Sequence, residues 1–309
     1  MSTDAAEVLV VGSLNMDLIA LAPQLPKRGE TVLGTRWTTA YGGKGSNQAV
    51  AAARMGARVA MMGRVGSDDY GRTLRDALVE EGIDCQAVTI DPEQATGLGL
   101  ITVDESGTNT IVVIPGSNAT LRPEHLEAHR TLLERARIVV CQLETPLVTV
   151  ARTIALASEL GKFVILNPAP APEASVFEPA LLRQVSLLVP NDSEAARLTG
   201  VAVQSIPQAM EAAQILHARG ASEVIITLAE QGLVYSRHGI QQHHPARPTK
   251  AIDATAAGDT FIGALAAALA RGEPMERAIA IGQTAASITV SRIGAQSSIP
   301  RRAEVMALM

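Results

Sequence analysis

Residues 138–167, IVVCQLETPLVTVARTIALASELGKFVILN, decide the fold of this chain. The stretch begins with the apolar run Ile138–Cys141, continues through the helical segment Thr149–Leu160 and ends with a second apolar run, Phe163–Leu166. A short apolar run on each side of a helical segment is typical of a strand–helix–strand unit with parallel strands. We therefore predict a parallel sheet at the centre of the protein.

The same alternation extends from this unit in both directions. Further strands are predicted over Glu7–Val11, Val59–Met62, Leu187–Val189, Glu223–Thr227, Leu233–Ser236 and Ile240–His243. Helices are predicted over Asn47–Met55, Asp69–Glu81, Pro123–Arg135, Ser193–Thr199, Ile206–Ala218, Asp259–Arg271 and Met275–Val290. Alternating strands and helices imply an α/β fold whose parallel sheet carries helices on both faces.

Four β-prone segments near the N-terminus do not fit this alternation. They are Leu18–Leu21, Thr31–Tyr41, Gly97–Val103 and Thr110–Ile114. The last two flank Glu105–Thr108, a hairpin signal. We predict a small separate sheet that acts as a lid, with strands roughly within residues 15–45 and 95–117 of a single 1–309 domain.

Composition excludes several classes of protein. The chain has 309 residues, 47% of them hydrophobic, which is ample for a large core. Its net charge is −5 and its aromatic content only 2%, so neither a basic surface for nucleic acid nor a base-stacking platform is expected. A small anionic ligand is still compatible, because backbone dipoles bind phosphate on acidic proteins as well.

The sequence predicts a cytoplasmic protein that does not enter a membrane. The two cysteines, Cys85 and Cys141, form no disulfide framework or zinc motif. Residues 1–7 are acidic and lack the basic region of a signal peptide. The apolar run Phe261–Ala270 is far shorter than the ~20 residues that span a bilayer.

Polar residues follow five of the predicted strands at their carboxyl ends. They are Asn15 and Asp17, then Gln142 and Glu144, then Asn167, then Asn191, Asp192 and Glu194, and finally Thr227. Polar loops that cap helices are common, so any one of these ends is weak evidence by itself. Ligands of open parallel sheets bind at the carboxyl ends of the strands, however, and five polar ends together favour one shared site.

The segment Asp253-Ala-Thr-Ala-Ala-Gly-Asp259 leads directly into a predicted helix. The small residues at its end leave the backbone N–H groups accessible, and a helix N-terminus attracts anions. Asp259 would lie in the first turn, where a carboxylate can accept the proton of a hydroxyl that attacks a phosphoryl group. A capped helix start in which Asp259 only complements the dipole is the structural alternative.

The segment Tyr41-Gly-Gly-Lys-Gly-Ser-Asn-Gln48 is a second candidate site. Its three glycines allow a close approach of the backbone to a ligand, and Lys44 and Asn47 offer partners for hydroxyl groups. The spacing matches neither a P-loop nor the Gly-x-Gly-x-x-Gly dinucleotide motif. A glycine-rich helix entry is the alternative.

Together these segments resemble the ribokinase (PfkB) family of carbohydrate kinases. The resemblance covers nearly the whole chain, from Val8-Leu-Val-Val-Gly-Ser-Leu-Asn15 to Gly294-Ala-Gln-Ser-Ser-Ile-Pro300. It implies a Rossmann-like domain with a β-sheet lid that also forms a homodimer contact, ATP as the phosphoryl donor, and Mg²⁺. The implied reaction is phosphorylation of the primary O5 hydroxyl of D-ribose; alternatives are 2-deoxyribose, another sugar or a nucleoside.

The resemblance also implies roles for individual residues, with Asp259 as the catalytic base. The implied sugar-binding residues are Asn15, Met16, Asp17, Gly43, Lys44, Gly45, Ser46, Asn47, Glu144 and Asp259. The implied nucleotide-binding residues are Asn191, Glu194, Thr227, Leu228, Ala229, Glu230, Gln231, Gly232, Ala257, Gly258, Asp259 and Gln283. A monovalent cation, K⁺, is implied at Asp253, Thr255, Thr289, Arg292, Gly294 and Ser298.

Two positions, Ala229 and Ala254, depart from the family pattern, and Ala254 stands where threonine is commoner. Ala229 stands where the family usually has glycine, so the nucleotide loop would be strained if it needs a positive φ there. Gln283 occupies a variable position.

A nucleotide-binding sensor without turnover and a dinucleotide-dependent oxidoreductase are the rival classes of protein. The intact Asp259 argues against the sensor, and the absence of the dinucleotide motif argues against the oxidoreductase.

Overall fold

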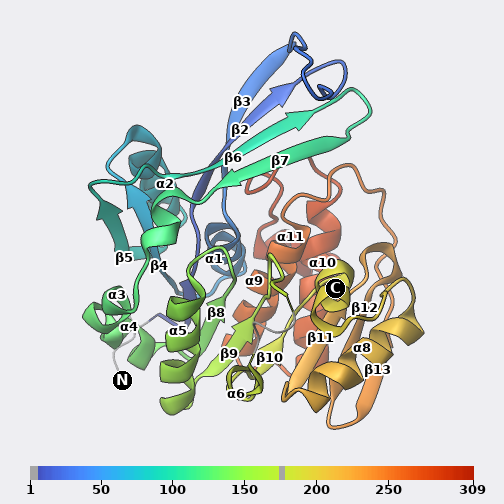
Figure 1. The fold of residues 1–309 in the computed structure, drawn as a ribbon. Coiled ribbons are helices and arrows are strands. Elements are labelled where there is room, and N and C mark those ends of the chain that lie inside the picture. Colours follow the sequence, from blue (N-terminus) through green and yellow to red (C-terminus); the bar gives the residue numbers. More distant parts are fainter. Residues whose placement is uncertain (1–5, 174–177) are drawn as a thin grey trace.

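The computed structural model describes residues 6–173 and 178–309, which form a large sheet between two layers of helices and a small sheet that projects from it (Figure 1). The large sheet has nine strands in the order β13-β12-β11-β10-β9-β8-β1-β4-β5. All neighbours are parallel except β11/β12 and β12/β13, which are antiparallel. The predicted α/β fold is therefore confirmed.

The elements of the large sheet and its helices are as follows. The strands are β1 Val8–Val11, β4 Val59–Gly66, β5 Asp84–Asp91, β8 Ile138–Cys141, β9 Phe163–Leu166, β10 Leu187–Leu188, β11 Glu223–Thr227, β12 Leu233–Arg237 and β13 Ile240–His244. The helices are α1 Lys44–Arg54, α2 Asp69–Glu80, α3 Pro123–Ala128, α4 Arg130–Arg135, α5 Leu147–Glu159, α6 Pro179–Leu182, α7 Asp192–Thr199, α8 Ile206–Ala218, α9 Ala257–Ala270, α10 Met275–Thr289 and α11 Arg302–Met306.

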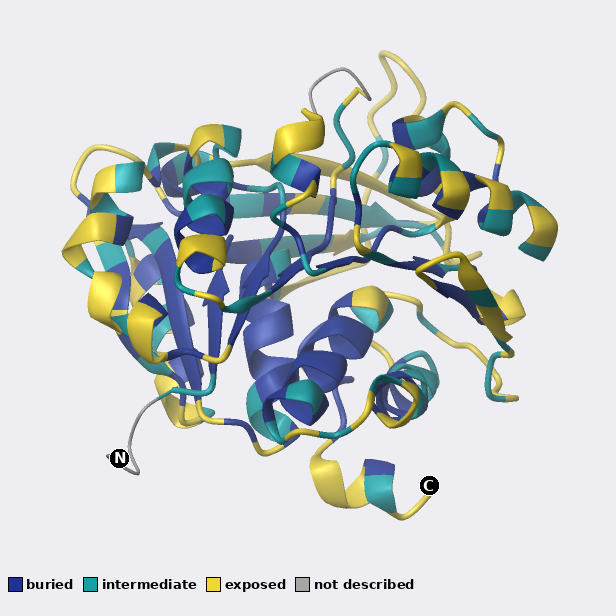
Figure 2. Cartoon of the chain, turned by 90° about the horizontal axis from the view of Figure 1, so that it is seen from below, coloured by how far each residue is buried: buried dark blue, intermediate teal, exposed yellow. Residues whose placement is uncertain are grey.

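The central strand β1 shows why the sheet needs both layers. All four of its residues are fully buried, because successive side chains point to opposite faces. Val8 and Val10 join the cluster beneath α1, α2, α9 and α10, whereas Leu9 and Val11 join the cluster beneath α3 to α8. Figure 2 shows these two layers with their buried sides against the sheet. The core thus holds the strand ends rigidly in place.

The small sheet has the order β3-β2-β6-β7, and we call it the lid sheet. Its strands are β2 Asn15–Leu21, β3 Arg36–Gly42, β6 Gly97–Val103 and β7 Asn109–Ile114. β2 and β6 pair in parallel, and the outer pairs are antiparallel. β2 follows β1 after three residues, so the lid sheet begins directly at the carboxyl end of the large sheet.

Several elements differ from the prediction. The helix predicted over Pro123–Arg135 is two helices that meet at His129. Strand β5, the short helices α6 and α11 and the 3₁₀ turn Gly116–Thr120 were not predicted. In the part of the chain that the structure describes, no helix is long and apolar enough to cross a membrane. Residues 1–5, on which part of the N-terminal prediction rests, lie outside the described residues.

Candidate active site

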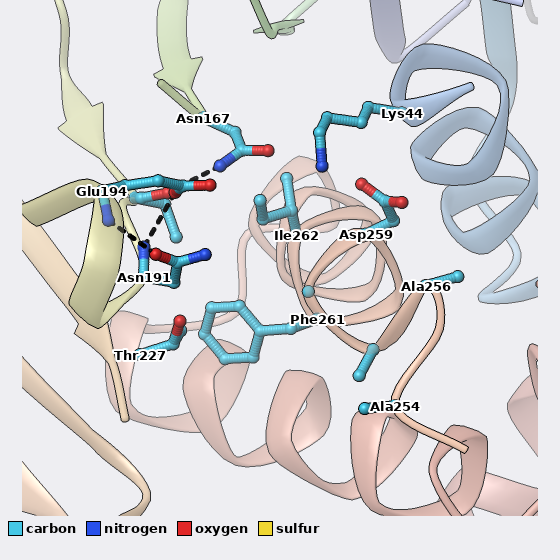
Figure 3. A pocket seen from close by; sticks show the side chains of 13 residues that line it. Lys44, Asn167, Asn191, Glu194, Thr227, Ala254, Ala256, Asp259, Phe261 and Ile262 are labelled. Atoms are coloured by element: carbon cyan, nitrogen blue, oxygen red, sulfur yellow. Dashed lines mark hydrogen bonds between the residues drawn. The ribbon is translucent and has the colours of Figure 1, made fainter. Parts of the chain in front are cut away.

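A pocket of about 190 Å³ lies at the carboxyl ends of the central strands, against the N-terminus of α9 (Figure 3). The residues that line it are Lys44, Asn167, Val189, Asn191, Glu194, Thr227, Ala254, Ala256, Ala257, Gly258, Asp259, Phe261 and Ile262. Seven of these were predicted site residues, and Asn167 was among the predicted polar strand ends. The Lys44 ammonium points into the pocket between Asn167 and Asp259.

The order of the strands explains why polar residues gather here. The five strands whose ends are polar lie side by side, in the order β11-β10-β9-β8-β1. Parallel strands deliver their carboxyl ends to one edge of the sheet, so Thr227, Asn191 and Asn167 arrive at the same pocket from three neighbouring strands. Asn191 also caps α7: its side chain accepts from Glu194 N, and Glu194 Oε2 accepts from Asn191 N at 2.9 Å.

The N-terminus of α9 is open toward the pocket. Its first flanking residue, Ala256, has a left-handed backbone with φ of 59° and provides no side-chain cap. Gly258 lines the pocket, and a Cβ there would meet no protein atom within 4 Å. Uncapped N–H groups at a helix start together with free space are the features of an anion site. The pocket therefore suits a phosphate group.

Asp259 lies in the first turn of α9, and its residue is only 8% exposed. Both of its carboxylate oxygens accept hydrogen bonds from α1: Oδ2 from Asn47 Nδ2 at 3.0 Å and Oδ1 from Gln48 Nε2 at 2.9 Å. Asn47 Oδ1 is buried and has no donor among the described residues. An acceptor left open beside a held carboxylate is suited to a ligand hydroxyl.

The Lys44 ammonium lies among several carboxylates at the pocket. Burial alone lowers the pKa of the Lys44 ammonium, but the carboxylates of Asp259, Glu144 and Glu194 outweigh this and raise the pKa above its ordinary value. Burial raises the pKa of Glu194, and the hydrogen bond from Asn191 N and the charge of Lys44 offset this only in part. A permanent cation and a helix N-terminus thus face the same space.

A second polar group lies between β8 and the lid sheet. Glu144 Oε2 accepts from Ser13 Oγ at 2.5 Å and from Lys44 N at 3.0 Å. Burial raises the pKa of Asp17 to about 7, and the charge of Glu144 adds to the effect. The Asp17 carboxylate fits only because its neighbours on β3 and β6 are glycines: a Cβ on Gly42 or Gly99 would lie within 2.3 Å of it.

The other residues predicted to bind sugar lie around Asn15 and the start of α1. Asn118 donates to Asn15 Oδ1 at 2.8 Å and to Leu14 O at 3.1 Å, and it accepts from Leu14 N. The side chain of Met16 is 2% exposed and packs in the core, so it offers a ligand only backbone atoms. Ser46 Oγ donates to Gly42 O, and Gly43 and Gly45 pack directly on the backbone of residues 12–15.

Sequence reasoning missed Ser13, Gln48 and Asn118 as parts of this site. Gln48 carried a usable signal, because it is a polar residue in an alanine-rich helix whose middle is otherwise apolar. Asn118 carried none, since its partners lie more than 100 positions away in the chain.

The predicted nucleotide loop follows β11 and continues through Ala229–Gln231 into β12. Ala229 has a φ of 48°, so the strain expected where the family has glycine is present. Gly232 packs against His244 and Ala246, and Gln283 donates to His244 O at 3.2 Å, so the loop and Gln283 meet at the same segment. Glu230 and Gln231 are exposed there, and the side chain of Leu228 is buried in the core.

The predicted cation residues come from the loop before α9 and from the end of α10 with the loop that follows it, and Asp253 connects the two segments. Asp253 Oδ1 accepts from Thr255 N and Oδ2 from Gly294 N, both at 2.9 Å. The other side chains already have partners within the protein. Thr289 Oγ1 donates to Thr260 Oγ1, Ser298 Oγ donates to Ala295 O, and Arg292 pairs with Glu304. Backbone carbonyls are the atoms that these residues leave for a cation.

A buried carboxylate beside an open helix N-terminus, with a separate sheet above, is the arrangement expected of a phosphotransferase that acts on a small hydroxylated substrate. Comparison with known proteins specifies the class. The profile of the "pfkB family carbohydrate kinase" matches residues 5–302, and the chain belongs to this family.

Individual relatives agree with this assignment. A ribokinase of Haemophilus influenzae is 40% identical over 297 residues, which cover 96% of each chain. A deoxyribokinase of Salmonella typhi is 33% identical and covers 95% of each. The structure of Arabidopsis thaliana ribokinase complexed with ribose and ATP superimposes with a TM-score of 0.90 at 30% identity, covering 98% of each chain. The predicted family is therefore confirmed.

Proposed function

We propose that this protein is an ATP-dependent kinase that converts D-ribose into D-ribose 5-phosphate. The observation that carries the proposal is the Asp259 carboxylate, held by two amides at the open N-terminus of α9 in a chain similar to ribokinases over its whole length. A kinase needs both features, because it must take a proton from a hydroxyl and hold the transferred phosphoryl group.

The proposed mechanism assigns each step to residues of this chain. Asp259 accepts the proton of the primary hydroxyl, whose oxygen then attacks the γ-phosphorus in line. The N–H groups of Gly258 and Asp259 and the Lys44 ammonium stabilise the charge on the phosphoryl oxygens. Asp17, Asn47 and Glu144 orient the sugar through its other hydroxyl groups.

ATP and Mg²⁺ are the cofactors that the pocket fits. Magnesium is commonly held by one or two carboxylates together with nucleotide phosphates, and Glu194 supplies a pocket carboxylate with Asn191 beside it. The segment from Thr227 to Gly232 and Gln283 would face the nucleoside. Bound there, Mg²⁺ neutralises phosphate charge; the proton transfer remains the task of Asp259.

Three further assignments complete the proposal. The loops that Asp253 joins hold a monovalent cation, K⁺, through their carbonyl groups. The lid sheet forms a homodimer contact, because every residue of β7 is exposed, including Ile111 and Val112. The cytoplasm is the proposed location, since both cysteines are free and buried as expected for a reducing compartment.

A related kinase for 2-deoxyribose is the second candidate. The deoxyribokinase match at 33% identity favours it, and the carboxylates of Asp17 and Glu144 can accept hydrogen bonds from hydroxyl groups of either sugar. The two candidate substrates differ only in the 2-hydroxyl group. The enzyme will discriminate against 2-deoxyribose if a buried acceptor of the site hydrogen-bonds this hydroxyl and is left without a partner when it is missing.

A coupled assay over a sugar panel, with and without K⁺, tests these assignments. We expect ATP consumption to be fastest with D-ribose and to rise when K⁺ replaces a large organic cation. Replacing Asp259 by asparagine should lower kcat about 10²- to 10⁴-fold, the usual contribution of general base catalysis. Preference for 2-deoxyribose would select the second candidate, and an Asp259→Asn enzyme of normal kcat would refute the mechanism.

A further inference from the structure

A chain of buried amides connects the catalytic carboxylate to the end of strand β8. Gln48 donates through Nε2 to Asp259 Oδ1 at 2.9 Å and to Asn167 Oδ1 at 3.2 Å. Its Oε1 accepts from Gln142 Nε2 at 2.7 Å. Gln48 and Gln142 are fully buried and Asn167 is 7% exposed, so water competes little for these groups.

This network permits only one orientation of the Gln48 amide. If the amide turned over, its oxygen would face the Asp259 carboxylate and the Asn167 oxygen, and its nitrogen would face the Gln142 donor. Asn167 is fixed in turn, because its Nδ2 donates to Val189 O at 3.0 Å. The Gln48 N–H group therefore always points toward Asp259.

Gln142 is confined by the backbone beside it. A Cβ on Gly12 would lie 2.0 Å from Gln142 Oε1, so only glycine leaves room for this amide. Gln142 Oε1 is buried and has no donor among the described residues. A buried acceptor without a donor lowers stability. Gln142 retains such an acceptor in its Oε1 atom, while its Nε2 atom donates to Gln48.

We infer that Gln48 is a positioning residue that fixes the plane of the Asp259 carboxylate for proton transfer, with Gln142 fixing Gln48. One N–H group on each carboxylate oxygen prevents rotation and leaves further lone pairs for the substrate hydroxyl. This role rests on the proposed kinase function. It is distinct from sugar binding, because Gln48 contacts other side chains and has no surface in the pocket.

The test is Gln48→Met, which keeps the length of the side chain and removes both donors. We expect kcat to fall about 10- to 100-fold, since small displacements of a catalytic group are costly, while KM for sugar and ATP changes less than about threefold. The double variant Gln48→Met with Gln142→Met removes both buried partners and should recover thermal stability without recovering kcat. Thr153→Val, which removes a buried hydroxyl of α5 bonded to Thr149 O, should leave kcat unchanged.

The pH dependence of Gln48→Glu gives a second readout that a purely structural role would not change. The introduced carboxyl has the same shape but donates to Asp259 only while it is protonated. The ratio of the kcat of Gln48→Glu to that of the unmodified enzyme should fall steadily between about pH 6 and about pH 9. Over this range the introduced carboxyl loses its proton, and the resulting carboxylate repels that of Asp259.

All variants are assayed with the sugar that the unmodified enzyme phosphorylates fastest. A preference for another sugar would then refute the ribose assignment and leave this test intact. A Gln48→Met enzyme whose kcat stays within about threefold of normal while its Tm falls would overturn the positioning role, as would a flat pH ratio for Gln48→Glu.

Discussion

The buried position of Asp17 lowers the stability of the folded protein at neutral pH. Burial, reinforced by Glu144, raises the pKa of this carboxyl to about 7, so the folded protein holds a proton that the unfolded chain releases near pH 4. The folded state therefore loses stability relative to the unfolded state as pH rises from about 4 to about 7, and the cost is fully present above pH 7.

Asp17→Asn should remove this cost. We expect its Tm to exceed that of the unmodified protein by about 2–5 °C at pH 8, with a smaller gain at pH 5, measured by thermal unfolding without ligands. Sugar affinity should fall at the same time, because the carboxylate acceptor is lost. Asp76→Asn makes the same change at an exposed position of α2 and serves as the control. A gain that is equal at both pH values would contradict the assigned cause.

At the residue scale, the sequence pointed to those residues of the pocket region that belong to a local motif. Asp259 was selected because small residues before a helix indicate an anion site, and Lys44 and Asn47 were selected because glycines surround them. Gln48 was quoted within that same motif but not assigned a role. Its importance depends on Gln142, which lies 94 positions away, and no local pattern records such a partnership.

At the scale of elements, the loop after β11 keeps a left-handed residue that is not glycine. A left-handed conformation costs a residue with a Cβ about 1–2 kcal/mol. Glycine adopts it without strain, although glycine also loses more entropy on folding. Ala229 thus adopts a left-handed backbone conformation that residues with a Cβ disfavour.

Ala229→Gly should relieve this strain. We expect the free energy of unfolding to rise by up to about 1 kcal/mol and KM for ATP to fall by no more than about threefold, measured by urea titration and steady-state kinetics. Ala267→Gly, placed in the interior of α9, should instead lose about 1 kcal/mol. Equal losses in the two variants would mean that Ala229 is unstrained.

The elements that the sequence failed to predict share a cause. The interruption at His129 divides a continuous helical pattern and has no proline or glycine to announce it. β5 is an edge strand that is only partly buried, so its apolar signal is weak beside that of the buried β1 and β8. Strong periodicity therefore located the core elements, whereas tertiary packing determined where the outer ones begin and end.

At the scale of the whole molecule, the lid sheet exposes several large apolar side chains. Ile111, Val112 and Trp37 are 54%, 59% and 69% exposed. Ile111 and Val112 are neighbours on β7 and point to opposite faces, so both faces of this edge are apolar. Exposed apolar patches of this kind mark sites of association.

The double variant Ile111→Lys with Val112→Lys should therefore abolish the proposed dimer. A charged edge strand resists pairing with a second copy, and we expect light scattering after gel filtration to give the monomer mass. Ile240→Lys places the same charge on the exposed edge strand β13 of the large sheet and should leave the dimer intact. A monomeric unmodified protein, or a dimeric double variant, would refute the lid contact.

The contact between α1 and the start of α9 also constrains how the protein is made. Asn47 and its partner Asp259 are 212 positions apart, and most of the sheet lies between them in the chain. A ribosome that adds about 5–20 residues per second needs on the order of 10–40 s to bridge that interval. During this time the alanine-rich side of α1 has no helix to cover it. The proposed catalytic centre is thus completed late in synthesis, because this side of α1 stays uncovered until α9 has been made.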